Sequence, residues 1–526
     1  MTDKILLYVH TIRRMKPIQI VSRVKKLLGI PCSLGVQPSM MHEKLRRFDS
    51  VEELDHDAVF LQRFPPDEFV AGTATFLHES EQIDWHGIWE FPNRSALWNF
   101  NLHYFEFLMP MVDAYQRTGD SKYLQTIEDA ISGWIKQNPC RSGGTGWASY
   151  PIAIRLTYWF SCYFALEDVL SQPLKKRMVS SIYEQYVYLS SHLEKDLLAN
   201  HYFEDLKALI LSAIAFQDDK MLECALKEFK VQCRAQILPD GMHYELSPMY
   251  HKIILEDVMR VAVALRSIGR QDNEIEQYLP KMLDVAYSFE DGLARIPLFN
   301  DGGNNVAKSL EALLAAGKNH FGLTPHLVNQ LTDSGYYFFQ HGNWRLIVDA
   351  GAPGAKENPG HAHCDAMSFE LFHNGEPVLV NCGTFAYQCD DRAFFRSTAA
   401  HNTVMIDGTE QSECWDAFRM GRGSQTRVLK VDENGIEMEM TDQHGQKVQR
   451  EICFDGRQLL VRDCAPEHML KATIHVIGLP NEAITSSSQA ASCTHWYAID
   501  YVQREAIRTL LWSARDEVAV CIKLVQ

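Results

Sequence analysis

Two histidines, His361 and His363, stand two residues apart immediately before an apolar run that predicts a β-hairpin. Its two strands, around residues 369–372 and 377–380, are joined by Asn374 and Gly375, a pair that favours a tight turn. On an extended chain, residues two apart point to the same face. Histidines held at the mouth of a hairpin could transfer protons or bind a ligand in a cleft. The alternative is a surface turn with two solvated histidines.

Other polar and aromatic residues accompany these histidines in a fixed order along the chain. Asn200 and His201 come first, followed by residues 240–251, which include Tyr244, Glu245 and Tyr250, and then by residues 381–387 and 396–404. In order and content, from about residue 98 to residue 411, this set resembles the heparinase II/III-like family of polysaccharide lyases.

The resemblance implies a β-elimination on a polysaccharide that contains uronic acid. Such a lyase removes the proton at C5, next to the carboxylate, and expels the sugar oxygen at C4. The enzyme must neutralise the carboxylate as a dianion develops, and it needs a base and an acid. Asn, His and Tyr suit these tasks, so no cofactor is required.

Asn200, His201 and His361 match the family's catalytic positions, and we choose Tyr250, on the helix that follows the Asp240-Gly241 turn, as the catalytic tyrosine. Asn200 would neutralise the carboxylate, His201 would act as a second donor or base, and Tyr250 and His361 would transfer protons. Each also has an ordinary interpretation, such as a helix cap for Asn200 or a packed helical residue for Tyr250. A phenol needs a nearby cation to act as a base, and we expect Arg155 or a protonated histidine to supply it. Tyr244 is the alternative catalytic tyrosine.

His363, Asn381 and His401 match positions that hold zinc in some relatives. The middle position is expected to be Asp, and a neutral amide is a poorer zinc ligand than a carboxylate. We therefore expect a hydrogen-bonded cluster, with a structural Zn²⁺ as the alternative.

Aromatic faces stack on sugar rings, and arginine can pair with a carboxylate or sulfate in a bidentate manner. On these grounds we expect the sugar cleft to be lined by Trp98, Asn101, His103, Trp147, Arg155, Tyr244, Glu245 and Arg396. Arg392 could reach the same place, or could pair with the acids that precede it.

From about residue 96 to residue 330 the apolar residues recur with helical spacing. The spacing predicts helices over residues 99–107, 152–170, 174–198, 202–216, 220–236, 250–268 and 274–289. Short loops make consecutive helices antiparallel neighbours. A ring of such hairpins would gather the loops at 143–147, 199–201 and 240–241 on one concave face. We therefore expect an (α/α) toroid, which the resemblance also implies.

After residue 335 the apolar period changes to two. The pattern predicts strands over residues 336–340, 344–348, 402–406, 427–431, 436–440, 458–462, 473–477 and 518–524. Many short antiparallel strands form a β-sandwich. We predict an α+β multidomain protein with a basic helical segment and irregular lead-in (1–95), an (α/α) toroid (96–334) and an antiparallel β-sandwich (335–526).

The net charge of −16 over 526 residues argues against nucleic acid as a partner. It also means that an acidic polysaccharide would need a locally basic cleft. Thirteen cysteines without a Cys-x-x-Cys pair favour reduced thiols, and the start of the chain lacks the pattern of a secretory signal. We expect a cytoplasmic protein without a transmembrane segment, with a role in the biosynthesis or turnover of a surface polysaccharide.

Residues 1–30 form a basic amphipathic pattern, with seven Lys or Arg residues against one acid, Asp3. Two helices of this kind could make a peripheral contact with a membrane surface, or could pack on the main domain; we favour packing.

Three functions remain open from the sequence. The first is the polysaccharide lyase. The second is a uronyl C5-epimerase, which removes the same proton and returns it from the other face. The third is a non-catalytic protein that binds or assembles glycans.

Overall fold

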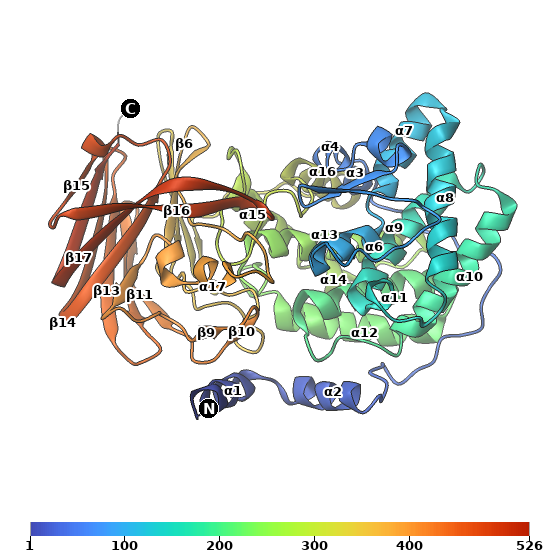
Figure 1. Cartoon of the computed structure of the whole chain (residues 1–526), viewed down its shortest axis with the longest axis horizontal. Helices are drawn as coiled ribbons and strands as arrows, with labels where there is room; N and C mark the ends of the chain where they lie inside the picture. The colour runs from blue at the N-terminus through green and yellow to red at the C-terminus, as the bar shows by residue number, and fades with distance from the viewer. Residues whose placement is uncertain (1, 525–526) are drawn as a thin grey trace.

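A computed structural model describes residues 2–524, which begin with two helices on the outside of the molecule (Figure 1). The lead-in, residues 31–95, follows these two helices. It was expected to be irregular, but it contains three short helices and a β-hairpin. The elements are α1 (Thr2–Arg14), α2 (Pro17–Leu27), α3 (Glu52–Asp55), α4 (Ala58–Gln62), α5 (Pro66–Val70), β1 (Thr73–Phe76) and β2 (Glu79–Gln82).

The next region is helical and runs to residue 321. Its elements are α6 (Ala96–Tyr104), α7 (Leu108–Thr118), α8 (Ser121–Gln137), the 3₁₀ helix η1 (Thr145–Trp147), α9 (Ser149–Leu166), α10 (Gln172–Leu189), α11 (Ala199–Ala215), α12 (Asp219–Gln236), α13 (Pro248–Ser267), α14 (Asn273–Glu276), α15 (Leu279–Glu290) and α16 (Leu310–Phe321).

Side-chain caps fix several of these helix starts. The side chains of Asp120, Asp218 and Ser309 accept hydrogen bonds from backbone N–H groups in the first turns of α8, α12 and α16. The predicted helix over residues 274–289 is split into α14 and α15, because Pro280 cannot sit inside a helix and instead lies in the first turn of α15.

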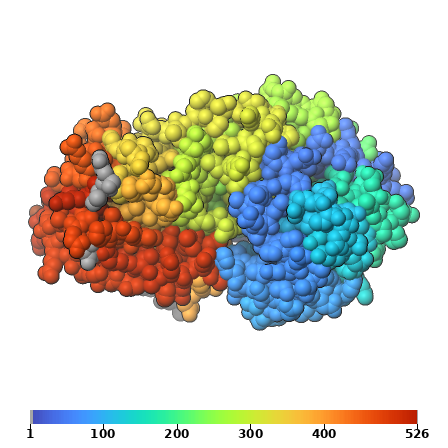
Figure 2. All heavy atoms as spheres, turned by 90° about the horizontal axis from the view of Figure 1, so that it is seen from above, coloured from blue at the N-terminus to red at the C-terminus, as the bar shows by residue number. Residues whose placement is uncertain are grey.

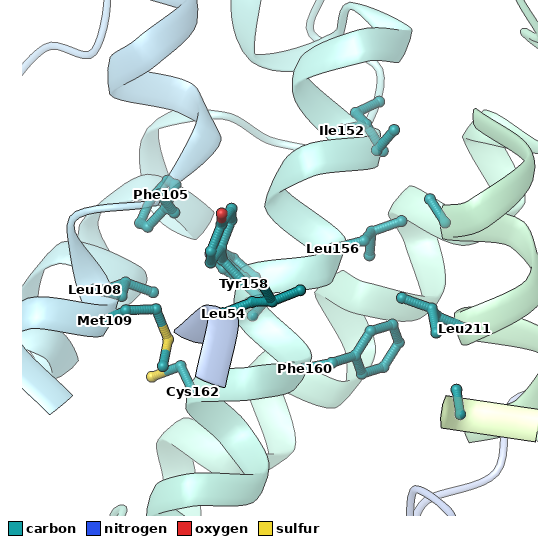
Figure 3. Close-up of a cluster of buried hydrophobic side chains, with 14 of the residues drawn as sticks. Leu54, Phe105, Leu108, Met109, Ile152, Leu156, Tyr158, Phe160, Cys162 and Leu211 are labelled. Atoms are coloured by element: carbon teal, nitrogen blue, oxygen red, sulfur yellow. The ribbon is translucent and has the colours of Figure 1, made fainter. Parts of the chain in front are cut away.

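The helices enclose an apolar core between their inward faces. Trp98, Trp134 and Trp159 are fully buried in it. Figure 3 shows part of this core, where side chains from the lead-in, from α7 and from α9 meet. Large apolar residues on both faces of α9 explain why this helix is buried almost throughout.

The remainder of the chain is mainly β. Its elements are β3 (Gln330–Leu331), β4 (Tyr336–His341), β5 (Trp344–Asp349), β6 (Phe369–His373), β7 (Glu376–Leu379), α17 (Arg392–Phe395), the 3₁₀ helix η2 (Thr398–Ala400), β8 (Val404–Ile406), β9 (Cys414–Trp415), β10 (Arg419–Met420), β11 (Gln425–Asp432), β12 (Gly435–Thr441), β13 (Lys447–Phe454), β14 (Gln458–Val476), the 3₁₀ helix η3 (Asn481–Ala483), β15 (Ile484–Ser486), β16 (Ala490–Asp500) and β17 (Gln503–Lys523).

Most of these strands form one antiparallel sheet that curls on itself. Its main path runs β11-β12-β13-β14-β7-β6-β5-β4-β3, and β8 and β17 also pair with β14. A single core contains Phe339 and Leu346 from one half of the path together with Met438 and Ile452 from the other. The two halves therefore face each other as two layers. Helices followed by this curled antiparallel sheet confirm the predicted fold class.

Apolar packing joins the helical region to the sheet. Met249 and Tyr250 from α13 share a cluster with Val380, Phe395 and other residues of the β region. In Figure 2 the red C-terminal strands meet the blue lead-in along this junction. Because the two regions pack directly on each other, side chains from both can be held in one site. Within residues 2–524, no helix has both the length and the apolar composition needed to cross a membrane.

Candidate active site

A cavity of about 770 Å³ lies at the junction of the helical region and the sheet. Pockets that hold small ligands are commonly found between domains. Several predicted site residues line it together with a group of aromatic side chains: Asn101, Asn200, His201, Tyr250, His361, Phe100, Tyr104, Tyr150, Tyr158, Phe385, Tyr387, Phe418 and Tyr501. The structure thus brings the four residues expected to be catalytic to one cavity.

Tyr250 lies in the first turn of α13, which Ser247 caps by accepting a hydrogen bond from the Tyr250 backbone N–H at 3.3 Å. Its hydroxyl is 2.6 Å from that of Tyr387, which in turn is 2.5 Å from that of Tyr501. Three phenols, one from the helical region and two from the β region, thus form one hydrogen-bonded chain across the junction.

The surroundings of Tyr250 favour the protonated phenol. Burial raises the pKa of Tyr250 well above its usual value, and the charge of Asp301 adds to this. Arg155, expected to lower that pKa, lies elsewhere in the helical core. This corrects the expectation that Arg155 lowers the pKa of Tyr250; with its pKa raised, the phenol is protonated at neutral pH and can donate a proton.

His361 is oriented by Asp301, a residue that the sequence analysis did not identify. Nδ1 of His361 lies 2.9 Å from Oδ2 of Asp301, and the imidazole packs against Tyr250 with the ring centres 4.2 Å apart. The segment around His361 and His363 is irregular rather than an extended strand. Both histidines nevertheless reach the same carboxylate, since Nε2 of His363 lies 2.9 Å from Oδ1 of Asp301.

Asp301 is a buried anion that accepts hydrogen bonds from several side chains. Arg392 binds its carboxylate with two nitrogens, and Thr384 donates to Oδ1 at 2.9 Å. Burial alone would raise the pKa of Asp301, but Arg392 and the hydrogen bonds from His361 and His363 hold that pKa well below its usual value. The ionised carboxylate therefore accepts Nδ1–H of His361, which leaves Nε2 as the acceptor when the ring is neutral.

Asn200 is the second residue of α11, and it donates from Nδ2 to Oε2 of Glu245 at 2.9 Å. Glu245 is buried behind the cavity wall, with Oε1 3.9 Å from Nε2 of His361. The amide of Asn200 has a second N–H, so it can still donate to a ligand in the cavity.

Left-handed backbone conformations flank these residues. Ala199 immediately before Asn200, Leu246 immediately after Glu245 and Asn300 immediately before Asp301 have φ values of 50°, 56° and 57°. Such conformations cost a non-glycine residue on the order of 1–3 kcal/mol and are concentrated at functional sites. This backbone strain supports the assignment of the active site to the cavity beside Asn200, Glu245 and Asp301.

His201 lies on the cavity wall and pairs with a carboxylate. Its Nδ1 is 3.0 Å from Oε2 of Glu194, and its ring lies 4.4 Å from that of Tyr150. Burial alone would lower the pKa of His201, but Glu194 raises it above its usual value. The imidazolium form therefore persists to higher pH, which suits a residue that binds an anion.

Three residues expected to line the cleft are instead part of the helical core. Arg155 donates to the side chain of Gln185 and to the carbonyls of His103 and Gly146. Nδ1 of His103 accepts a hydrogen bond from Trp134, and burial lowers the pKa of His103 to about 3. Trp147 is 3% exposed. His103, Trp147 and Arg155 therefore position helices rather than contact a ligand; Trp98 is likewise buried.

Tyr244 and Arg396 also lie behind the cavity. Tyr244 packs in a small apolar cluster with Ala199 and Ala355. Arg396 donates to the carbonyls of Ala362 and of four other residues in two loops, so it holds the loop that carries His361. These contacts correct the expectation that both side chains face the sugar.

The three residues that could hold zinc are buried together. The rings of His363 and His401 lie 5.2 Å apart, and Nδ1 of His363 and both ring nitrogens of His401 have no hydrogen-bond partner in the described structure. Oδ1 of Asn381 accepts a hydrogen bond from the backbone N–H of Asn402 at 3.0 Å. In residues 2–524, no group of three or more His, Cys, Asp or Glu side chains is arranged to hold a metal ion. Whether zinc binds stays a prediction.

The fold is that of solved polysaccharide lyases. The crystal structure of heparinase III superposes with a TM-score of 0.69 at 16% identity, over 97% of this chain and 92% of that chain. The chondroitin AC lyase of Streptomyces coelicolor superposes with a TM-score of 0.52 at 11% identity, over 90% and 80%.

The chain belongs to the heparinase II/III-like family. The family model for the heparinase II/III N-terminus matches residues 35–324, and the heparinase II/III-like C-terminal model matches residues 324–499. The family resemblance drawn from the sequence is thereby confirmed.

Curated relatives are distant. The heparin-sulfate lyase of Pedobacter heparinus is 22% identical over 369 residues, 62% of this chain and 54% of that protein. The corresponding lyase of Bacteroides thetaiotaomicron is 24% identical over 411 residues, 65% and 57%. The alginate lyase of Stenotrophomonas maltophilia is 21% identical over 402 residues, 60% and 53%. The chain thus spans about half the length of the relatives it matches.

Proposed function

We propose that the protein is a polysaccharide lyase that cleaves a uronic-acid-containing polymer by β-elimination. The observation that carries this proposal is the contact between the rings of Tyr250 and His361, whose centres lie 4.2 Å apart at an interplanar angle of 33° on the wall of one cavity. Two proton-transfer groups at this separation can act on adjacent carbons of one sugar.

In the proposed reaction, Nε2 of neutral His361 takes the proton from C5. The electrons of that C–H bond form the C4=C5 double bond as the C4–O bond breaks. The hydroxyl of Tyr250 gives its proton to the departing oxygen, and the chain through Tyr387 and Tyr501 can share the resulting charge. Asp301 stabilises the imidazolium that forms, as a buried carboxylate does for a catalytic histidine.

Asn200 and His201 would bind the uronate carboxylate. They are adjacent on the cavity wall, one a neutral donor and the other a histidine with a raised pKa. Negative charge grows on the carboxylate as the C5 proton leaves, so donors already aimed at it lower the barrier.

The same geometry bears on the two alternatives. An epimerase returns the proton from the opposite face of the sugar, whereas the rings of Tyr250 and His361 lie against each other and so present both proton-transfer groups from one side. A non-catalytic glycan-binding protein would not need Asp301 to fix the tautomer of His361. We therefore favour the lyase.

The charges around the cavity favour a weakly sulfated or unsulfated polymer. Its cationic lining residues, Arg63, Lys207 and Lys308, are offset by the acids Glu106, Glu204, Glu256 and Asp500. Lys207 lies 2.7 Å from Glu204 and 2.6 Å from Asp257, and Arg63 donates to two backbone carbonyls.

Lys308 differs from the other two cations, because its Nζ has no hydrogen-bond partner in the described structure, and burial lowers its pKa to about 7. Densely sulfated chains are bound by several unpaired cations. In this cavity the amine of Lys308, which lies over the Phe60 ring, stands beside mainly neutral donors and aromatic rings, which matches a polymer whose main charge is the uronate itself.

The test is ultraviolet absorbance of the unsaturated uronate during incubation with a panel of acidic polysaccharides. We expect a rise with an unsulfated uronate polymer and a much smaller rise with heavily sulfated chains. Exchange of the C5 proton with solvent without a rise would support the epimerase, and binding with neither would support the glycan-binding protein. The cytoplasmic location and the biosynthetic or turnover role stay predictions.

A further inference from the structure

Helices α1 and α2 turn an apolar face outward. Among the described side chains, 24 large apolar residues are exposed, and twelve of these lie between Ile5 and Ile30. Ile5, Val9 and Ile12 follow one face of α1, and Val21 and Val24 follow one face of α2, with Leu28 just past its end. Both helices lie along the lower edge of the molecule in Figure 1.

The opposite, polar side of these helices faces the protein. On α1, His10 lies 2.7 Å from Glu413, and Arg14 donates to the carbonyls of Lys356 and Gly421. On α2, Gln19 and Ser22 are buried. The segment therefore does pack on the main body, as we expected, but with its polar residues inward. This reverses the usual arrangement, in which the apolar stripe of a helix faces the core.

Exposed basic residues border the apolar face, and they include Lys4, Arg13, Arg23, Lys25 and Lys26. The positive charge of this segment contrasts with the net charge of the whole chain, which is −16. Lysine is depleted in protein–protein interfaces, whereas an apolar face bordered by Lys and Arg is typical of helices that lie in the plane of a lipid surface. We propose that α1 and α2 bind the protein to an anionic lipid surface.

This surface lies next to the candidate active site. Helix α1 packs against β10, and Trp415 in β9 donates from Nε1 to the hydroxyl of Thr11. Between these two strands lies Phe418, which lines the cavity and has its ring 6.1 Å from that of His361. A protein bound through α1 and α2 would thus hold this wall of the cavity close to the lipid.

The proposal is tested by sedimentation of the full-length protein with vesicles. Vesicles that contain about one third phosphatidylglycerol in phosphatidylcholine should retain the protein, and pure phosphatidylcholine vesicles should retain much less. Arg23→Gln with Lys25→Gln should weaken binding about 25-fold, since each basic residue near an anionic surface contributes about fivefold. Raised salt should have a similar effect.

A second variant tests the apolar face. Val21→Gln with Val24→Gln should weaken binding at least about tenfold, because two buried aliphatic side chains are lost from the lipid contact. Val169→Gln with Leu327→Gln removes exposed apolar residues elsewhere and should leave binding unchanged. Lyase activity on a soluble substrate should be the same in all four proteins, the wild type and the three double variants.

Two results would overturn the proposal. One is wild-type protein that stays in the supernatant with the anionic vesicles. The other is a dimer in analytical ultracentrifugation that Val21→Gln with Val24→Gln converts to monomers, since a second copy would then cover this face. Neither result bears on the lyase reaction, which is measured separately.

Discussion

Oδ2 of Asp301 and Nδ1 of His361 lie 2.9 Å apart although the two residues are 60 positions apart in the chain. The same carboxylate accepts hydrogen bonds from Arg392 and Thr384, so the anion and the imidazole are fixed together. This pair orients Nε2 of His361, the atom to which we assign removal of the C5 proton.

Asp301→Asn should lower kcat by about 10²–10⁴-fold, because an amide no longer fixes the tautomer of His361 or stabilises its cation. Stopped assays of unsaturated-uronate formation measure this loss.

Thr384→Val is the matched control for Asp301→Asn, since it removes one donor to the same carboxylate and leaves the charge in place. It should change kcat by less than about tenfold. An Asp301→Asn variant that is folded, as judged by circular dichroism, and keeps its kcat would exclude the positioning role.

Asn200→Ala should lower kcat by about 10²–10⁴-fold, because the developing dianion loses a neutral donor. The change also leaves Oε2 of Glu245 without this donor, which costs about 1–3 kcal/mol of stability. Asn99→Ala controls for that loss: Asn99 is another buried asparagine, bonded to the backbone of Phe91, and it does not line the cavity. It should reduce the melting temperature but not kcat. Equal kcat in both variants would remove Asn200 from the mechanism.

Glu194→Gln should alter the pH dependence of substrate binding. Glu194 raises the pKa of His201, so at higher pH His201 loses its charge and KM should rise. Without the carboxylate that pKa falls, and the rise in KM should begin at lower pH. Glu311→Gln, on an exposed position of α16, should leave the profile unchanged. A profile that is also unchanged in Glu194→Gln would show that His201 does not bind substrate as a cation.

Elemental analysis of the purified protein should find substoichiometric zinc. The amide of Asn381 carries no charge, and its oxygen already accepts a backbone hydrogen bond. Equimolar zinc in the wild type that is lost in His401→Ala would show that two histidines and this amide suffice.

Much of the fold could be predicted from the sequence, because apolar residues recur with the spacing of helices in the first part of the chain and of strands in the second. The hairpin around Asn374 and Gly375 forms as expected in β6 and β7. Two predicted strands, over residues 458–462 and 473–477, are parts of the single long strand β14. Between them the pairing of β14 with β17 shifts register at residues 466–468, which are exposed or half-buried, so no apolar alternation there indicates a continuous strand.

The site was less predictable because loop composition does not show which way a side chain points. Trp147 lies in the loop 143–147, which was expected to face a cleft, and His103 lies in the last turn of α6. Both side chains are nevertheless buried in the helical core. Asp301 stands in the run Asn300-Asp301-Gly302-Gly303, which has the composition of an ordinary turn. Its partners are 60 to 91 positions away, and local sequence contains no signal of them.

The central claim is that Tyr250 transfers a proton in a β-elimination. The most direct measurement is the rate of unsaturated-uronate formation by wild type, Tyr250→Phe and Tyr244→Phe on the best unsulfated polymer. Tyr250→Phe removes one hydroxyl and keeps the ring against His361, so we expect folded protein with kcat reduced about 10²–10⁴-fold. Tyr244→Phe, in its apolar cluster behind the cavity, should stay near wild type. Near-normal kcat in Tyr250→Phe with an inactive Tyr244→Phe would contradict this assignment, and full activity in both would contradict the proposed mechanism.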